Sequence, residues 1–162
     1  MNKAVFLDRD GVLINNSQYY YIWEADQMEF IEGVFDNLKL LQQNGYQLFI
    51  VSNQGGISRG LYTREDILKL HEQMITTFNS HQIQIRDILF CPHHPDHEKC
   101  LCRKPASLMI DKLIAKYDIS KAASVMIGDS ESDMKSAQLA GIKGLRVTPN
   151  VNMYPQISTL LV

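Results

Sequence analysis

The sequence has only three cysteines in 162 residues, no long hydrophobic run and no large excess of charge. Apolar runs such as 48–51 are far shorter than the roughly 20 residues that span a bilayer, so we expect no membrane segment. The N-terminus reaches Asp8 without the apolar stretch of a signal peptide, which favours a cytoplasmic location. With 16 basic and 18 acidic side chains, the net charge of -2 gives no field that would attract nucleic acid. Any phosphate chemistry is therefore expected in a local site.

The length of the chain predicts a single domain over residues 1–162. Hydrophobic residues make up 45% of the chain and charged residues 21%, which is close to the globular average and argues against disorder. We therefore expect one independently folding core that acts as a monomer.

Short apolar runs alternate along the chain with segments of helical periodicity. The apolar runs are typical of buried strands, and the periodic segments indicate amphipathic helices. Strand–helix alternation favours right-handed crossovers, so we predict a doubly wound parallel α/β sheet covered by helices on both faces. The expected strands lie at 4–7, 48–51, 87–90, 125–127 and 145–147, and the expected helices lie near 34–44, 63–78, from 105 onward, and 131–140.

Two helix boundaries have specific signals. Thr63, followed by acidic residues in the next turn, is expected to be an N-cap. Proline is favoured in the first turn of a helix, so Pro105 is expected to open the third helix. The core face of that helix would carry Leu108, Leu113 and Ile114.

Polar residues collect where the expected strands end. Because ligands of open α/β sheets bind beyond the carboxyl ends of the strands, these residues define one candidate site. Carboxylates there would bind a hard divalent cation, while hydroxyl, amide and ammonium groups would bind phosphate oxygens. The site would contain Asp8, Asp10, Ser52, Asn53, Lys104 and Asp129.

Two carboxylates at this edge suit hydrolysis of a phosphate ester. Asp8 would be the nucleophile, because an aspartyl-phosphate intermediate divides one difficult displacement into two easier ones. Asp10 would protonate the leaving oxygen and then activate water. Taken alone, an Asp-x-Asp pair is usually a turn, the 52–53 pair can be a cap, and Lys104 can be a surface charge. Their shared position at strand ends favours the site.

All three cysteines lie between positions 91 and 102 beside three histidines. Two close pairs of thiolate and imidazole ligands suit one tetrahedral Zn²⁺ ion, and four protein ligands indicate a structural role. His94 or His97 can replace His93 in this set, and a flexible loop with incidental thiols is the alternative. The assigned ligands are Cys91, His93, Cys100 and Cys102.

Four short segments, taken in order, resemble the motifs of the haloacid dehalogenase superfamily of phosphohydrolases. They are residues 6–11 (FLDRDG), 51–53 (VSN), Lys104, and 128–133 (GDSESD). The resemblance covers nearly the whole chain. The stretch between the first and second motifs is too short for a large lid domain, so the site is expected to be open.

This resemblance implies a Mg²⁺ ion held by the Asp8 carboxylate, the Asp10 backbone carbonyl and Asp129. Asp133 is implied as support for Lys104 or for the water molecules on the metal. Ser52 is implied as a contact to the transferring phosphoryl group.

The cysteine loop and the following Arg-Lys-Pro resemble one branch of the superfamily, which contains heptose bisphosphate phosphatases and histidinol-phosphate phosphatases. Residues 52–60 and 19–22 are more similar to the heptose enzymes, which implies removal of the 7-phosphate of D-glycero-D-manno-heptose 1,7-bisphosphate. Histidinol phosphate is the alternative substrate. Ser130 departs from the branch, which usually has a basic residue there. The implied substrate contacts are Asn16, Ser17, Gln18, Tyr19, Ser52, Asn53, Gln54, Gly55, Arg103 and Lys104, with Arg59 as a further candidate.

Three other readings fit the sequence less well. A receiver domain would carry its phospho-acceptor aspartate at the end of the third strand, where Cys91 stands. A nucleic-acid end phosphatase would carry a basic stripe, which the charge balance argues against. A zinc-stabilised interaction module would not need the phosphate motifs. We therefore expect an enzyme that acts on a small phosphorylated metabolite.

Overall fold

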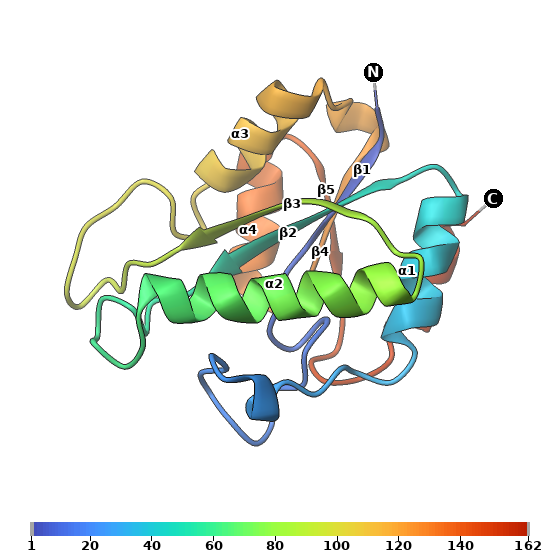
Figure 1. Ribbon diagram of the computed structural model, residues 1–162. Helices are drawn as coiled ribbons and strands as arrows, with labels where there is room; N and C mark the ends of the chain where they lie inside the picture. Colours follow the sequence, from blue (N-terminus) through green and yellow to red (C-terminus); the bar gives the residue numbers. More distant parts are fainter. Residues whose placement is uncertain (1, 162) are drawn as a thin grey trace.

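The computed structural model describes residues 2–161 and contains one five-stranded parallel sheet (Figure 1). The strand order is β3-β2-β1-β4-β5, with β1 in the centre. This architecture confirms the expected doubly wound α/β fold. The strands are β1 (Ala4–Leu7), β2 (Gln47–Asn53), β3 (Ile85–Cys91), β4 (Val125–Gly128) and β5 (Lys143–Arg146).

The helices divide between the two faces of the sheet. Buried residues of α1, α2 and α5 share one hydrophobic cluster, and those of α3 and α4 share another. The α-helices are α1 (Val34–Gln43), α2 (Arg64–Ser80), α3 (Leu108–Tyr117), α4 (Glu131–Ala140) and α5 (Tyr154–Ile157). Short 3₁₀ turns occupy Ala25–Gln27, Lys121–Ala123 and Ser158–Leu160.

The central strand β1 is completely buried, and its side chains alternate between the two clusters. Val5 and Leu7 pack on the α1 and α2 side, whereas Phe6 lies on the α3 and α4 side. Phe6 stacks on Phe49 of β2 with 5.5 Å between ring centroids. Close packing on both faces makes the end of β1 a rigid support for the residues that follow it.

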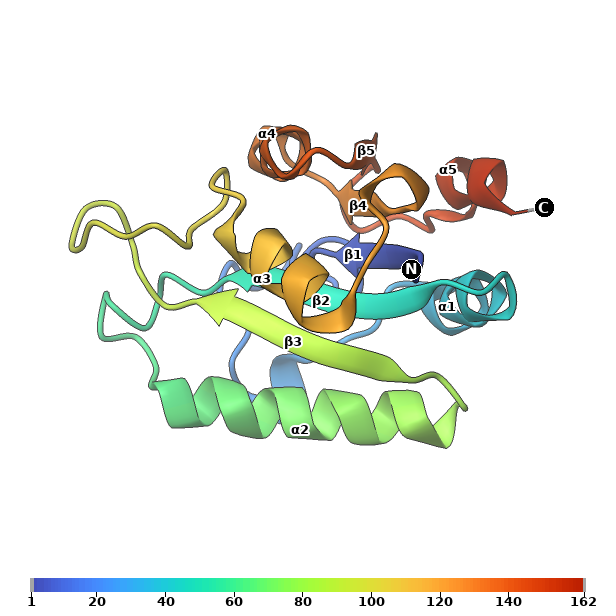
Figure 2. The same cartoon turned by 90° about the horizontal axis from the view of Figure 1, so that it is seen from above.

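The strand order reverses between β1 and β4, because the chain runs outward from β1 to β3 and then returns to β4 and β5. Such a reversal is where open α/β sheets bind ligands. Asp8 directly follows β1, and Asp129 directly follows β4. The loops after β2 and β3 reach the same end of the molecule, where they lie side by side in both views (Figure 1, Figure 2).

Thr63 caps α2 as expected, because its hydroxyl accepts a hydrogen bond from the Asp66 N–H and the Asp66 carboxylate bonds back. The expectation for Pro105 is wrong: α3 begins three residues later, at Leu108. Hydrogen bonds between Lys104 and Asn53 of β2 hold the backbone outside a helix at this point. Of the residues expected on its core face, Leu113 is buried and Ile114 is partly buried against the same cluster. Leu108 is only partly buried, and the other buried positions are Met109 and Ile110.

No helix within residues 2–161 is both long enough and apolar enough to cross a bilayer.

Candidate active site

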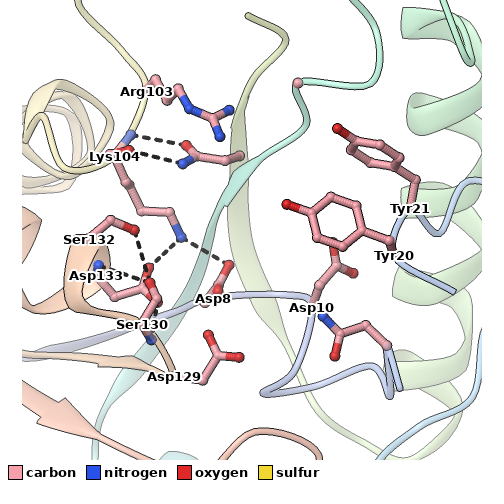
Figure 3. A pocket seen from close by; sticks show the side chains of 13 residues that line it. Asp8, Asp10, Tyr20, Tyr21, Arg103, Lys104, Asp129, Ser130, Ser132 and Asp133 are labelled. Carbon is pink, nitrogen blue, oxygen red and sulfur yellow. Dashed lines mark hydrogen bonds and ion pairs between the residues drawn. The ribbon is translucent and has the colours of Figure 1, made fainter. Parts of the chain in front are cut away.

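A pocket opens at the carboxyl ends of β1, β2 and β4. In the close view, Lys104 and the carboxylates near it lie on one side, and Tyr20 and Tyr21 lie on the other (Figure 3). The pocket is lined by Asp8, Asp10, Asn16, Tyr20, Tyr21, Asn53, Gly55, Arg103, Lys104, Asp129, Ser130, Ser132 and Asp133.

A buried ion cluster lies at the base of this pocket. The Lys104 ammonium is 2.9 Å from Asp8 Oδ1 and 2.6 Å from Asp133 Oδ1. Burial acts to lower the pKa of Lys104, but the two carboxylates hold that pKa above its usual value. Burial also raises the pKa of Asp8 to about 8. Burial and the Asp133 carboxylate raise the pKa of Asp129. Two carboxylates near this ammonium, those of Asp8 and Asp129, therefore resist ionisation.

Lys104 is fixed at its backbone as well as at its ammonium group. The Asn53 side chain accepts a hydrogen bond from the Lys104 N–H at 3.0 Å and donates to the Lys104 carbonyl at 3.1 Å. The ammonium also donates to the Val51 carbonyl at 2.9 Å. These bonds hold the residue against β2 and aim its charge at Asp8.

The carboxylates provide a fitting set of donors for a hard divalent cation. One oxygen from each of Asp8, Asp129 and Asp133 lies within 4.8 Å of the others. Asp133 is already occupied, because one oxygen pairs with Lys104 and the other accepts from the Ser130 hydroxyl at 2.7 Å. Asp8 and Asp129 are therefore the better available ligands. Gly11 keeps this space open, since its φ is +83° and a Cβ would overlap the Asp129 carboxylate.

Asp10 is held from beneath by a buried polar network. Arg9 Nε donates to Asp10 Oδ1 at 2.8 Å, and Arg9 Nη2 donates to Asp10 Oδ2 at 3.0 Å. Gln54 donates to Asp10 Oδ2 at 3.2 Å and accepts from the Tyr62 hydroxyl at 2.8 Å. Burial raises the pKa of Tyr62, which keeps it a hydrogen-bond donor. His71 of α2 lies 3.1 Å from Arg9 Nη1 and completes the network.

The cysteine loop after β3 brings four donor atoms together. Sγ of Cys91 lies 3.4 Å from Nδ1 of His93, 3.7 Å from Sγ of Cys100 and 3.0 Å from Sγ of Cys102. The edges of a tetrahedron around Zn²⁺ with sulfur ligands are about 3.8 Å. The cluster is therefore compatible with zinc, and it contains His93, not His94 or His97.

This loop is tied to the pocket by hydrogen bonds. Arg103 Nη1 donates to the His93 carbonyl at 3.0 Å, and the Ser58 hydroxyl accepts from the His94 N–H at 2.7 Å. The Ser58 N–H in turn donates to the Pro92 carbonyl at 3.1 Å. The shape of the cysteine loop therefore determines the position of Arg103 and of the loop that follows β2.

The predicted site residues occupy three kinds of position. Ser52 and Gln54 are buried beneath the pocket and bonded to each other at 2.8 Å, whereas Arg59 is exposed and lies 3.4 Å from the Tyr21 hydroxyl. Ser17, Gln18 and Tyr19 are exposed and lie outside the lining. The predicted residues that line the pocket are Asp8, Asp10, Asn16, Asn53, Gly55, Arg103, Lys104, Asp129 and Asp133.

Sequence reasoning missed several residues of the site. Tyr20 and Tyr21 line the pocket, and the aromatic run 19–23 was the available signal for them. Ser132 also reaches the lining, and Ser130 both caps α4 and lines the pocket. His71 carried no signal, because a lone histidine in a helix has no motif.

Residues 10–147 match the model of the haloacid dehalogenase-like hydrolase family, and Asp8 lies two positions before this range. The chain belongs to this family.

Curated relatives of this hydrolase are phosphatases. The chain is 42% identical over 156 residues to D-glycero-beta-D-manno-heptose-1,7-bisphosphate 7-phosphatase of Haemophilus influenzae, covering 93% of this chain and 81% of that protein. It is 39% identical over 140 residues to D-glycero-alpha-D-manno-heptose-1,7-bisphosphate 7-phosphatase of Campylobacter jejuni, covering 86% and 78%. The two relatives are named for different anomers.

A solved structure supports the same relationship. The hydrolase superposes with a TM-score of 0.84 on D,D-heptose 1,7-bisphosphate phosphatase from B. bronchiseptica, which was crystallised with magnesium and phosphate. The two proteins are 28% identical, and the alignment covers 97% of this chain and 86% of that one.

The buried imidazole leads to a prediction about stability in acid. Burial and the positive charge of Arg9 lower the pKa of His71 from 6.5 to about 3. Between these two pH values, His71 is protonated in the unfolded chain but neutral in the folded protein. Each pH unit of acidification in this range therefore lowers the free energy of unfolding by roughly 1.4 kcal/mol at this residue. Compared with the unmodified protein, His71→Gln should therefore lose less free energy of unfolding as the pH falls from about 6.5 to about 4.5. Urea unfolding along this range measures both slopes, and parallel slopes would contradict the prediction.

Proposed function

We propose that this protein is a Mg²⁺-dependent phosphatase that removes the 7-phosphate of D-glycero-D-manno-heptose 1,7-bisphosphate. The observation that carries the proposal is the convergence of Asp8, Asp10, Lys104 and Asp129 in one pocket. The curated relatives at about 40% identity support the choice of substrate. We further propose that residues 1–162 act as a single domain and as a monomer.

In the first step, a carboxylate oxygen of Asp8 attacks the phosphorus atom in line with the leaving oxygen. The P–O bond to the sugar breaks while Asp10 transfers a proton to the leaving oxygen, which departs as an alcohol. Lys104 neutralises charge on the phosphoryl group, and we propose that the Ser52 hydroxyl donates a hydrogen bond to it. The products of this step are an aspartyl-phosphate on Asp8 and a dephosphorylated C7 hydroxyl.

In the second step, Asp10 takes a proton from a water molecule, whose oxygen attacks the phosphorus atom. The P–O bond to Asp8 breaks, which regenerates the carboxylate and releases inorganic phosphate. Asp10 therefore serves as acid and then as base, so its orientation matters in both steps.

A Mg²⁺ ion fits the oxygen donors, and we propose that the carboxylates of Asp8 and Asp129 with the Asp10 backbone carbonyl hold it. When bound, it supplies positive charge to the phosphoryl oxygens and stabilises the ionised carboxylates. Asp133 instead holds the Lys104 ammonium in position. One Asp133 oxygen pairs with Lys104 and the other accepts from Ser130, so neither is available to the metal.

We propose that residues at the rim of the pocket select the substrate. Arg103 projects into it beside Lys104, and we propose that it contacts the part of the substrate beyond the transferring phosphate. Asn16 and Gly55 also line the pocket, and Gly55 lies next to Arg103. Zn²⁺ in the cysteine loop would hold Arg103 indirectly, because Arg103 bonds to the carbonyl of the proposed ligand His93.

Asp8→Asn should abolish turnover, because the amide cannot form the phosphorylated intermediate. We expect kcat to fall by at least about a thousandfold, as for other nucleophile deletions. Phosphate release with Mg²⁺ measures the rate, and circular dichroism with thermal melting checks that the fold is retained. Activity close to that of the unmodified protein would exclude Asp8 as the nucleophile.

Heptose 1,7-bisphosphate should be the preferred substrate. We expect the larger kcat/KM for one of its two anomers and a much smaller value for histidinol phosphate. All three compounds are assayed side by side with Mg²⁺. Preference for histidinol phosphate would contradict the proposed substrate, and activity on none would contradict the substrate class.

Cys102→Ser should lower zinc content, thermal stability and activity together, since one ligand of four is lost. Elemental analysis should find about one zinc per chain in the unmodified protein. His97→Gln is the matched control in the same loop and should keep the metal. An unchanged zinc content in Cys102→Ser would reject the proposed ligand set.

A further inference from the structure

The side chain of Arg9 is completely buried behind the pocket, and each of its three nitrogens has a hydrogen-bond partner. Its Nε and Nη2 donate hydrogen bonds to the Asp10 carboxylate, and Nη2 also donates to the Ile22 carbonyl at 2.7 Å. Its remaining terminal nitrogen, Nη1, lies 3.1 Å from Nε2 of His71. A buried guanidinium is costly unless it is paired and hydrogen-bonded, so each of these partners restricts its orientation.

The same contacts leave the two oxygens of Asp10 unequal. Oδ2 accepts from Arg9 Nη2 and Gln54 Nε2, whereas within residues 2–161 Oδ1 accepts only from Arg9 Nε. A carboxylate offers about four lone-pair sites, and three are used here. The remaining one belongs to Oδ1. Asp10 lines the pocket and its side chain is 20% exposed, so this oxygen is the one available to a ligand.

His71 restricts the guanidinium from the side away from Asp10. Arginine only donates hydrogen bonds, so Nε2 of His71 must accept and the ring proton must reside on Nδ1. The imidazole is 5% exposed and packs edge-on against Phe90 at 5.6 Å between ring centroids. Its lowered pKa agrees with a neutral ring that accepts. The histidine is therefore a fixed acceptor on a packed helix.

We propose that His71 is a positioning residue for catalysis: its imidazole fixes the Arg9 guanidinium, which in turn holds Asp10 with Oδ1 facing the leaving oxygen of the substrate. This inference rests on the proposed role of Asp10 as general acid. His71 contacts neither substrate nor metal in this scheme and acts through Arg9 alone.

The proposal predicts a dependence on the leaving group. A sugar alkoxide needs the proton from Asp10 to depart, whereas the nitrophenolate of p-nitrophenyl phosphate leaves without one. The parameter kcat/KM includes steps only up to the first irreversible one, which is departure of the leaving group. Misplacement of Asp10 should therefore lower kcat/KM for heptose 1,7-bisphosphate and spare p-nitrophenyl phosphate. A general loss of folded protein would lower both values by the same factor.

Two variants with side chains of similar size distinguish the effect of the His71 hydrogen bond from the effect of its packing. His71→Leu removes the acceptor, and we expect kcat/KM for the heptose substrate to fall about 10- to 100-fold, which is part of the roughly 100- to 10,000-fold that general acid catalysis contributes. The value for p-nitrophenyl phosphate should change by less than about threefold. His71→Gln places an amide oxygen near the position of Nε2, so its kcat/KM for the heptose substrate should stay close to that of the unmodified protein. If the leucine variant does not fold, His71→Asn replaces it, because its shorter side chain brings the acceptor out of reach.

Two control variants test the alternatives: a general effect of altering α2, and an error in the proposed role of Asp10. Met74→Leu alters another buried residue of α2 and should leave the ratio of the two kcat/KM values unchanged. Asp10→Asn should give the same leaving-group signature as His71→Leu, but larger. If Asp10→Asn lowers both substrates equally, the proposed role of Asp10 is wrong. If Asp10→Asn gives the signature and the His71 variants lower both substrates equally, or neither, the role of His71 is overturned.

Discussion

The burial of the Lys104 ammonium is the constraint on which the rest of the site depends. A charge that is 4% exposed must be paired, and its partners are the carboxylates of Asp8 and Asp133. These three residues come from the ends of β1, the loop after β3 and the first turn of α4. The pairing therefore joins three segments of the chain at one point. Asn53 of β2 adds a fourth segment by binding the backbone of Lys104 on both sides.

The burial of Lys104 also explains why the acidic residues have different roles. Asp133 is fully buried and has both oxygens engaged, one by Lys104 and one by the cap of α4. Asp8 and Asp129 keep oxygens that face the pocket, and burial raises the pKa of each. A divalent cation would relieve this cost by stabilising the ionised carboxylates. The site thus fits the cation and the phosphate that we propose it binds.

Two supports outside the pocket maintain its geometry. On one side, the cysteine loop holds Arg103 through the His93 carbonyl and contacts the loop after β2 through Ser58. On the other side, α2 presents His71 to Arg9 behind the general acid proposed here. Both supports place charged groups by hydrogen bonds from rigid segments, which costs less entropy at the time of binding than ordering a mobile loop.

Local sequence patterns predicted the alternation of strands and helices, the carboxylates at the strand ends and the close spacing of the cysteines. These features depend on local periodicity and on short motifs, so they can be read without knowledge of packing. The start of α3 was misplaced because Asn53, far away in the chain, holds Lys104 in a non-helical position. No local pattern showed that Tyr20 lines the pocket while Tyr19 does not, or that His71 contacts Arg9. Such contacts join residues distant in sequence, and they follow from how α2 and the loops pack on the sheet.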